Sequence, residues 1–209
     1  MTTPPTLCWY FDFISPFAYL HWRKIRTLAT QQPVELVPIL FAAVLNAHGQ
    51  KGPAEIPGKR EFTYRHVLWQ ARREGIALRF PPAHPFNPIP ALRLCIAAGT
   101  TPAAIDAIYR WIWAEGRAAD SAEALAPVNA ALGVDPAMLA NETVKATLRS
   151  NTDAALGAGV FGVPTLLVGD TLFWGNDVHA FALEALHDPA LLDDAEMRRI
   201  ASLQVAVHR

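Results

Sequence analysis

The sequence is short of the groups on which redox and metal chemistry depend. It contains only two cysteines, Cys8 and Cys95, and they do not form a C-x-x-C pair. Both stand in apolar runs, where a free cysteine behaves as a small buried hydrophobic residue. We therefore expect neither cysteine to be catalytic and expect no disulfide between them. The seven histidines show no metal-ligand spacing, and we expect no metal site.

Charge and long hydrophobic runs are also scarce. Charged residues make up 18% of the chain, hydrophobic residues 52%, and the net charge is -1. This composition argues against disorder, and the lack of a basic stripe argues against nucleic acid as a partner. No apolar run approaches the ~18 residues that span a bilayer. The opening MTTPP has neither the basic nor the apolar region of a signal peptide, so we expect a cytoplasmic protein with no membrane partner.

The beginning of the chain predicts a strand, a helix and a second strand. The run 7–13 consists of strand formers and leads into Ser15-Pro16. Serine favours the N-cap of a helix and proline its first turn. Apolar residues at helical spacing continue over 17–29, and 34–41 is the next strand candidate. A parallel β-α-β unit follows from this order.

The middle of the chain shows helical patterns without strands. A loop rich in Gly, Pro and Lys occupies 47–60, and a rigid proline-rich break occupies 80–88. Helices are predicted from residue 62 to about 159, with separate segments at 91–98, 102–115, 121–132, 136–139 and 141–158.

Strand patterns return near the C-terminal end. Residues 163–168 and 171–174 are short strands joined by Gly169-Asp170, which indicates a hairpin. Helices follow near 177–186 and after Pro189.

The order of elements predicts an α/β fold of a specific kind. It is a thioredoxin-like fold (β-α-β … β-β-α) with a large all-α domain inserted in the middle. We assign 1–46 and 160–209 to a discontinuous thioredoxin-like domain and 47–159 to the inserted helical domain. The simpler doubly wound α/β fold would need strands alternating with helices in the middle, and the sequence offers none.

Three segments of the predicted sheet are candidates for one site: Ser15-Pro16, 162–165 and 174–177. Each also has a purely structural explanation. Ser15 is a good helix N-cap, and a proline that opens a strand is common at a sheet edge. On these residues alone the alternatives stay open.

The three segments together resemble the 2-hydroxychromene-2-carboxylate isomerase family. They are FDFISPFAYL at 11–20, FGVPT at 161–165 and FWGND at 173–177, and QKGPAEIPGK at 50–59 and HPFNP at 84–88 fit as well. That family is related to the kappa-class glutathione transferases and, more distantly, to the periplasmic thiol oxidant DsbA. The resemblance implies glutathione as cofactor, a small-molecule aromatic substrate and a homodimer.

Ser15 is the predicted catalytic residue. Redox relatives carry C-x-x-C at this helix N-terminus, because the helix dipole and free N–H groups stabilise a thiolate. Here the four positions are Ser-Pro-Phe-Ala at 15–18, so the site has no sulfur of its own. It can still stabilise the thiolate that glutathione brings. The dipole contributes ~0.3–1 kcal/mol, or ~2 when partly buried, and a hydroxyl donating to an anion roughly 1.5–3 kcal/mol.

The resemblance also assigns the residues that bind glutathione. Val163 stands before the family's cis-proline and would pair with the cysteinyl backbone. Asn176 and Asp177 would hold the γ-glutamyl end, although Asp177 is also explained as an N-cap. A lysine suits the glycyl carboxylate, but Lys59 is equally well explained as a solvated surface residue. The full glutathione-binding set is Gln50, Lys59, Val163, Pro164, Trp174, Asn176 and Asp177.

Aromatic and polar residues near these segments are candidates for the second substrate's pocket. The set is Phe17, Phe62, His84 and Asn87; for the last two, a purely structural loop is an equally good explanation. The chain departs from the family at Phe62, His66 and Val178, where tyrosine, aspartate and arginine are usual. The pocket for the second substrate is therefore expected to differ from that of the naphthalene-pathway isomerase.

The resulting hypothesis is a glutathione-dependent cis/trans isomerase of an unsaturated aromatic keto acid, of the 2-hydroxychromene-2-carboxylate type. Two alternatives stay open. One is a kappa-class-like glutathione transferase that releases the adduct, and the other is a non-catalytic thioredoxin-like binding module.

Overall fold

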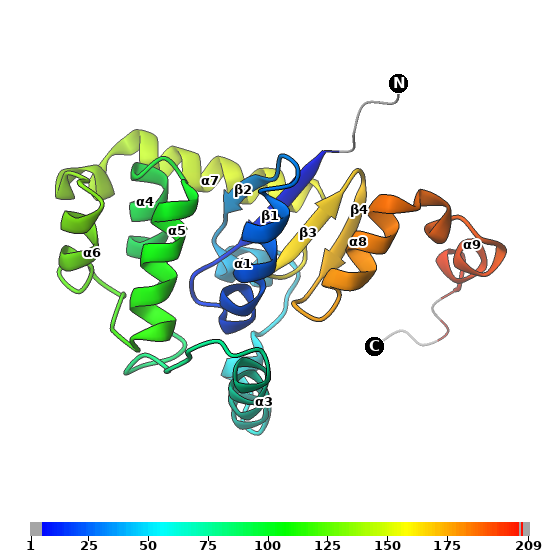
Figure 1. Ribbon diagram of the computed structural model, residues 1–209, viewed down its shortest axis with the longest axis horizontal. Helices are drawn as coiled ribbons and strands as arrows, with labels where there is room; N and C mark the ends of the chain where they lie inside the picture. The colour runs from blue at the N-terminus through cyan, green and yellow to red at the C-terminus, as the bar shows by residue number, and fades with distance from the viewer. Residues whose placement is uncertain (1–5, 205, 207–209) are drawn as a thin grey trace.

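A four-stranded mixed sheet forms the centre of the computed structural model, which describes residues 6–204 and 206 (Figure 1). The strands are β1 (Leu7–Phe11), β2 (Glu35–Pro38), β3 (Thr165–Val168) and β4 (Thr171–Trp174), in the order β2-β1-β3-β4. β1 pairs parallel with β2 and antiparallel with β3, and β3 pairs antiparallel with β4. This arrangement confirms the predicted fold class, including the hairpin at Gly169-Asp170.

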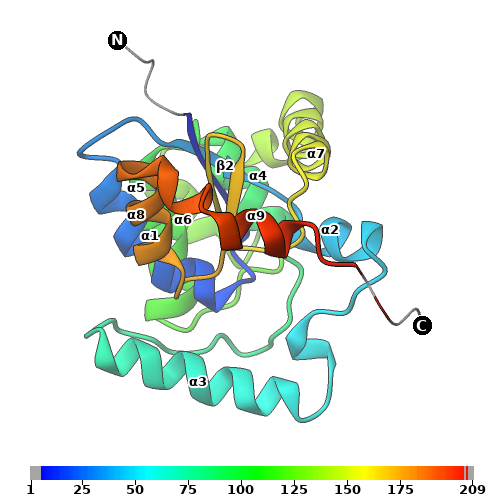
Figure 2. The ribbon, with the colours of Figure 1, turned by 90° about the vertical axis from the view of Figure 1, so that its right-hand side faces the viewer.

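Helices surround the sheet. Figure 1 shows α4, α5 and α6 gathered beyond β2, and α8 and α9 at the opposite end beyond β4. Figure 2 shows α3 lying apart along one edge. The helices are α1 (Pro16–Leu28), α2 (Phe41–Ala47), α3 (Lys59–Arg73), α4 (Ile89–Ala97), α5 (Pro102–Tyr109), α6 (Ala126–Ala131), α7 (Glu142–Gly157), α8 (His179–His187) and α9 (Ala195–Ala201), with short 3-10 or π turns at Pro53–Glu55, Arg110–Ala114, Pro136–Ala140 and Pro189–Leu192.

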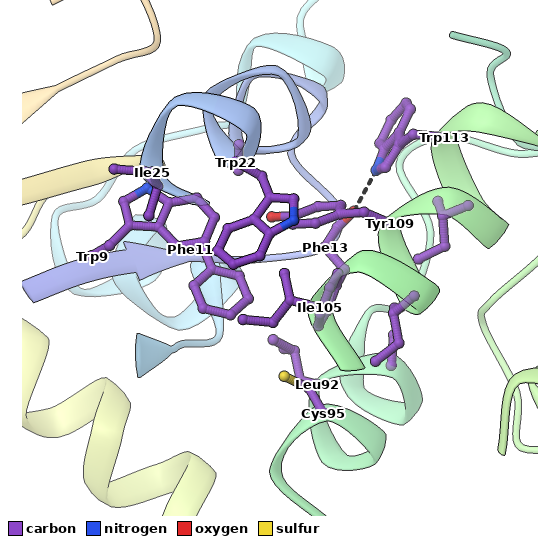
Figure 3. Packing of buried hydrophobic residues seen from close by; sticks show 14 of the residues in the cluster. Trp9, Phe11, Phe13, Trp22, Ile25, Leu92, Cys95, Ile105, Tyr109 and Trp113 are labelled. Carbon is purple, nitrogen blue, oxygen red and sulfur yellow. Dashed lines mark hydrogen bonds between the residues drawn. The ribbon is translucent and has the colours of Figure 1, made fainter. Parts of the chain in front are cut away.

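An aromatic core joins the sheet to the helices that lie between β2 and β3 in the sequence. The side chains of Trp9 and Phe11 on β1 stack with ring centroids 4.4 Å apart, and Phe13 lies 4.7 Å from Tyr109 of α5 (Figure 3). All five residues of β1 are buried. Stacked aromatic rings bury large apolar areas and fix one another's orientation. The end of β1 is therefore held firmly by packing. The core crosses the predicted domain boundary, and the division into two domains stays a prediction.

The predicted second strand is too long. β2 ends at Pro38, and the chain enters α2 at Phe41, where the sequence had suggested more strand. The reason is tertiary, since the Phe41 N–H donates to the carboxyl Oδ2 of Asp12 at 2.9 Å. This bond turns the chain away from the sheet.

The helix predicted at 121–132 is also shorter in the structure, where α6 begins at Ala126. Proline has no N–H and clashes with the preceding turn, so it is tolerated only in the first turn of a helix. Pro127 therefore forces the helix to start beside it.

The two cysteines are buried and free, as the sequence predicted. Over the described part of the chain, no helix has the length and apolar character that crossing a membrane requires.

Candidate active site

Ser15 caps the N-terminus of α1. Its Oγ accepts a hydrogen bond from the Ala18 N–H at 3.2 Å, and only 7% of the residue is exposed. The N-cap prediction is confirmed. Pro16 has no N–H, and the amide of Phe17 and the hydroxyl proton of Ser15 have no acceptor among the described residues. Two free donors therefore stand at the positive end of a 13-residue helix.

The backbone that carries Ser15 into the helix, residues 12–15, is called the active-site turn below. The Ser15 N–H closes it by donating to Asp12 O at 3.1 Å. Three aromatic side chains from the segment between β2 and β3 point to three of its four carbonyls: Tyr109 Oη to Asp12 O at 3.5 Å, Trp113 Nε1 to Phe13 O at 2.8 Å (Figure 3), and His84 Nε2 to Ile14 O at 2.9 Å. The segment between β2 and β3 thus holds the turn through three side-chain donors, one from a loop and two from helical turns.

Asp12 holds the turn from inside. It is fully buried, and its two carboxyl oxygens accept from the Ile14 N–H at 3.1 Å and the Phe41 N–H at 2.9 Å. Burial raises the pKa of Asp12 to about 7, against the opposing effect of the backbone N–H groups of Phe41, Ile14 and Phe13. The sequence analysis did not place Asp12 in the site. The available signal was an acidic residue inside a run of strand formers.

Replacing Asp12 with asparagine tests this assignment. The native pKa lies above the ordinary ~3.9, so the native state binds the extra proton and wild-type stability falls as pH rises from about 4 to about 7. The asparagine NH2 would face one of the two backbone N–H groups and leave it unpaired, which costs roughly 1–3 kcal/mol. The deficit of Asp12→Asn in free energy of unfolding should therefore be larger at pH 5 than at pH 8.

Denaturant unfolding at the two pH values measures this difference. Asp153→Asn, an exposed aspartate on α7, serves as the control and should show no such trend. A deficit of Asp12→Asn that grows between pH 5 and pH 8 would contradict the assignment.

The segment before β3 lies beside the active-site turn. The Val163–Pro164 peptide is cis, as the resemblance implied. The antiparallel register pairs Thr165 with Tyr10, so Pro164 falls next to the end of β1, just before the turn. The N–H and C=O of Val163 have no hydrogen-bond partner within the described part of the chain. They are therefore free to pair with an extended ligand.

The third predicted segment joins the same region. The Gly175 N–H donates to Pro164 O at 2.9 Å. Asn176 is 2% exposed, and its Oδ1 accepts from Lys24 Nζ of α1 at 2.9 Å. The Asn176 Nδ2 is buried without an acceptor among the described residues. Lys24 thus ties α1 to this segment, a role that the sequence analysis missed because nothing local marks it.

The exposed residues of the third segment point outward. Trp174 is 53% exposed and stacks edge-on against Phe161, and Asp177 is exposed. The N-cap of α8 is Val178, without a side-chain cap. The alternative explanation of Asp177 as the helix cap is therefore wrong, which leaves its carboxylate available.

Gly175 tests whether this segment matters for binding. Its φ is +117°, and a Cβ built there would lie 2.6 Å from Asp177 Oδ1. Gly175→Ala should cost ~1–3 kcal/mol in stability through backbone strain, displace Asp177, and weaken glutathione binding as measured by calorimetry. Gly133→Ala is the matched control, because Gly133 also has a positive φ of +64° but open space around it. Equal glutathione affinity in both variants would contradict the prediction.

Other predicted glutathione residues are not joined to this cluster by any described contact. Gln50 and Lys59 are exposed on either side of the turn Pro53–Glu55. Their roles stay predictions.

The predicted substrate residues fall into two places. Phe62 is 68% exposed on α3 and stacks on His66 at 5.7 Å, and His66 lies 6.0 Å from Phe17 at the start of α1. These rings form an aromatic face near Ser15. Asn87 instead accepts from the Ile89 N–H at 3.2 Å in a local turn, and both ring nitrogens of His84 are used inside the protein.

Two of the side chains that hold the active-site turn carried no usable sequence signal. One lies on α5 and the other on the π turn that follows it. Tyr109 and Trp113 stand in an apolar helical pattern that is typical of core residues, and they are indeed buried. Within the described residues, no group of three or more His, Cys, Asp or Glu side chains is arranged to hold a metal ion.

Known proteins resemble this chain over most of its length. The model of the DSBA-like thioredoxin domain family matches residues 6–187. The Pseudomonas putida protein named 2-hydroxychromene-2-carboxylate isomerase is 32% identical over 185 residues, covering 84% of this chain and 91% of that protein. A Caenorhabditis elegans protein named glutathione S-transferase kappa 2 is 27% identical over 179 residues, covering 77% and 80%.

A solved structure supports the same family relationship. A structure of 2-hydroxychromene-2-carboxylate isomerase superposes with a TM-score of 0.75 at 27% identity, covering 92% of this chain and 98% of that one. The chain therefore belongs to the 2-hydroxychromene-2-carboxylate isomerase family, within the DSBA-like thioredoxin-domain proteins.

Proposed function

We propose that this chain is a glutathione-dependent cis/trans isomerase of an unsaturated aromatic keto acid of the 2-hydroxychromene-2-carboxylate type. The observation that carries the proposal is Ser15. Its Oγ already accepts from the Ala18 N–H, so its own proton is free to point at an incoming anion. The position that would carry a cysteine in a redox relative has a donor instead, and the two cysteines of the chain are buried elsewhere.

The donors at this helix start suit a thiolate. The dipole of α1 and the free Phe17 N–H contribute ~0.3–1 kcal/mol, or ~2 when partly buried. The Ser15 hydroxyl adds roughly 1.5–3 kcal/mol. Since ~1.4 kcal/mol corresponds to one pKa unit, a thiol with a pKa of ~8.5 would be lowered to ~6–7 and largely ionised at neutral pH.

The residues around Ser15 fit glutathione. A buried donor left unpaired costs ~1–3 kcal/mol, so the orphaned Asn176 Nδ2 favours a ligand that brings an acceptor, such as the γ-glutamyl carboxylate. Asp177 would hold the γ-glutamyl ammonium. The free N–H and C=O of Val163 would pair with the cysteinyl backbone. Lys59 and Gln50 would hold the glycyl end.

The chemistry divides between ligand and protein. When bound, glutathione would supply a thiolate for reversible addition to the unsaturated substrate, in whose adduct the former double bond can rotate. Ser15 keeps the sulfur ionised before addition and receives it again on departure. The aromatic rings of Phe17 and Phe62 offer a face for the substrate's ring.

The name of the Caenorhabditis elegans relative favours a second candidate, a glutathione transferase. Its first step would use the same residues. Stoichiometry separates the two, because an isomerase leaves total glutathione constant whereas a transferase depletes it. We further propose that the protein acts in the cytoplasm as a homodimer, and equilibrium sedimentation measures the latter.

The absorbance of the glutathione thiolate against pH tests the proposal. Bound to the wild type, the thiol should titrate about 1.5–2.5 pH units below free glutathione, the shift that the two contributions together predict. Ser15→Ala should return much of that shift. The absence of binding at millimolar glutathione in a calorimeter would instead identify a non-catalytic module.

A further inference from the structure

His84 is bonded at both ring nitrogens to other parts of the protein. Its Nε2 lies 2.9 Å from Ile14 O in the active-site turn. Its Nδ1 lies 2.7 Å from the hydroxyl of Tyr64 on α3, and that hydroxyl also lies 2.8 Å from the His84 carbonyl oxygen. A ring held at both ends has a fixed orientation.

The partners determine which nitrogen carries the proton. A backbone carbonyl only accepts, so Nε2 must donate to Ile14 O. In the neutral ring Nδ1 is then the acceptor, and the single Tyr64 hydroxyl proton is shared between Nδ1 and the His84 carbonyl oxygen. Burial lowers the pKa of His84, with a further lowering by the charge of Arg60, and the Ile14 carbonyl opposes both. The neutral ring with its proton on Nε2 is therefore the form that the surroundings favour.

The carbonyl that His84 holds belongs to the peptide unit of Ser15. The oxygen at one end of the Ile14–Ser15 peptide accepts from His84, and the N–H at its other end donates to Asp12 O at 3.1 Å. The orientation of this peptide, together with the Ser15 φ of -87°, positions the Cα–Cβ bond from which Oγ extends. We propose that His84 is a positioning residue for Ser15, and that its Nε2–H orients the Ser15 hydroxyl toward the thiolate. This inference rests on the proposed function.

Packing alone does not require a histidine here. The ring lies among Phe80 and Trp113 with centroids 6.0 and 5.5 Å away. An aromatic or aliphatic side chain would satisfy these neighbours equally well. What such a side chain lacks is a donor for the half-buried Ile14 carbonyl, which would then tilt and carry Ser15 with it.

Three variants and one control separate the donor from the ring. His84→Leu removes the donor and should raise the thiol pKa of bound glutathione by about one unit and lower kcat about tenfold, with little change in KM. His84→Gln supplies an amide donor in place of Nε2. It should recover most of the lowered thiol pKa and most of kcat. Tyr64→Phe frees Nδ1 and should have a smaller effect. His187→Leu is the control, since His187 bonds the Leu183 carbonyl on α8, far from the turn in sequence.

A readout on the free wild-type protein keeps the inference testable if His84→Leu fails to fold. Nitrogen-15 NMR of the histidine rings should find His84 protonated at Nε2 and not at Nδ1. A ring protonated at Nδ1 alone overturns the inference. So does a folded His84→Leu protein that lowers the glutathione thiol pKa as far as the wild type does. Failure of the proposed function looks different, because the wild type itself would then leave that pKa unshifted.

Discussion

Replacing Ser15 with alanine should lower kcat/KM of glutathione-dependent isomerisation by about 10²–10³-fold. The reason is that one preorganised hydrogen-bond donor to an anion, here the glutathione thiolate, is worth that much in a desolvated site. The Ser15 hydroxyl proton has no acceptor among the described residues and is therefore free to donate to the thiolate. Substrate and glutathione affinities should change much less than kcat. Steady-state kinetics with a substrate of the 2-hydroxychromene-2-carboxylate type measure kcat and the KM values for substrate and glutathione.

The same substitution also removes a helix cap, which costs ~0.5–2 kcal/mol in stability. Thr101→Ala is the matched control. Thr101 Oγ1 accepts from the Ala104 N–H at 3.2 Å, the same geometry as at Ser15, but at the start of α5. It should lose similar stability and keep full activity. If the two variants lose activity alike, Ser15 acts only through the helix, and its assignment as the catalytic residue is wrong.

Replacing Trp113 with alanine should destabilise the protein by about 3–5 kcal/mol, the cost of a large buried cavity. Trp113 is fully buried in the aromatic core, and its Nε1 donates to Phe13 O at 2.8 Å (Figure 3). Urea unfolding at constant pH measures the loss. Because the side chain holds the active-site turn, turnover should fall even where the protein remains folded.

Two companion variants separate packing from the hydrogen bond. Trp113→Phe keeps most of the ring volume and loses the N–H, so it should cost ~1–3 kcal/mol by leaving the buried Phe13 carbonyl unpaired. Trp69→Ala removes a tryptophan that is 52% exposed on α3 and should stay within about 1 kcal/mol of the wild type. A Trp113→Phe protein as stable and as active as the wild type would show that the turn does not depend on this donor.

Local chemistry made much of the fold predictable. Ser15-Pro16 specifies a helix start through its own side chain and ring, and Gly169 supplies the positive φ of +62° that the hairpin needs. Pairing of β1 with β3 brings the neighbourhood of Pro164 to the end of β1, as the order of elements implied. The helix start and the hairpin depend on residues that are adjacent in sequence. The pairing of β1 with β3 depends on the topology, and the order of elements is compatible with few others.

What the sequence by itself determined is therefore the thioredoxin-like order of elements, the capped helix start at Ser15 and the segments that meet there. The tertiary structure alone decided what holds that start in place. The Phe41 N–H that stops β2 reaches Asp12 across 29 residues, and His84 and Trp113 reach the turn across 70 and 100. No local pattern marks such partners, because a backbone carbonyl is the same at every position and selects its donor only by where the folded chain places it.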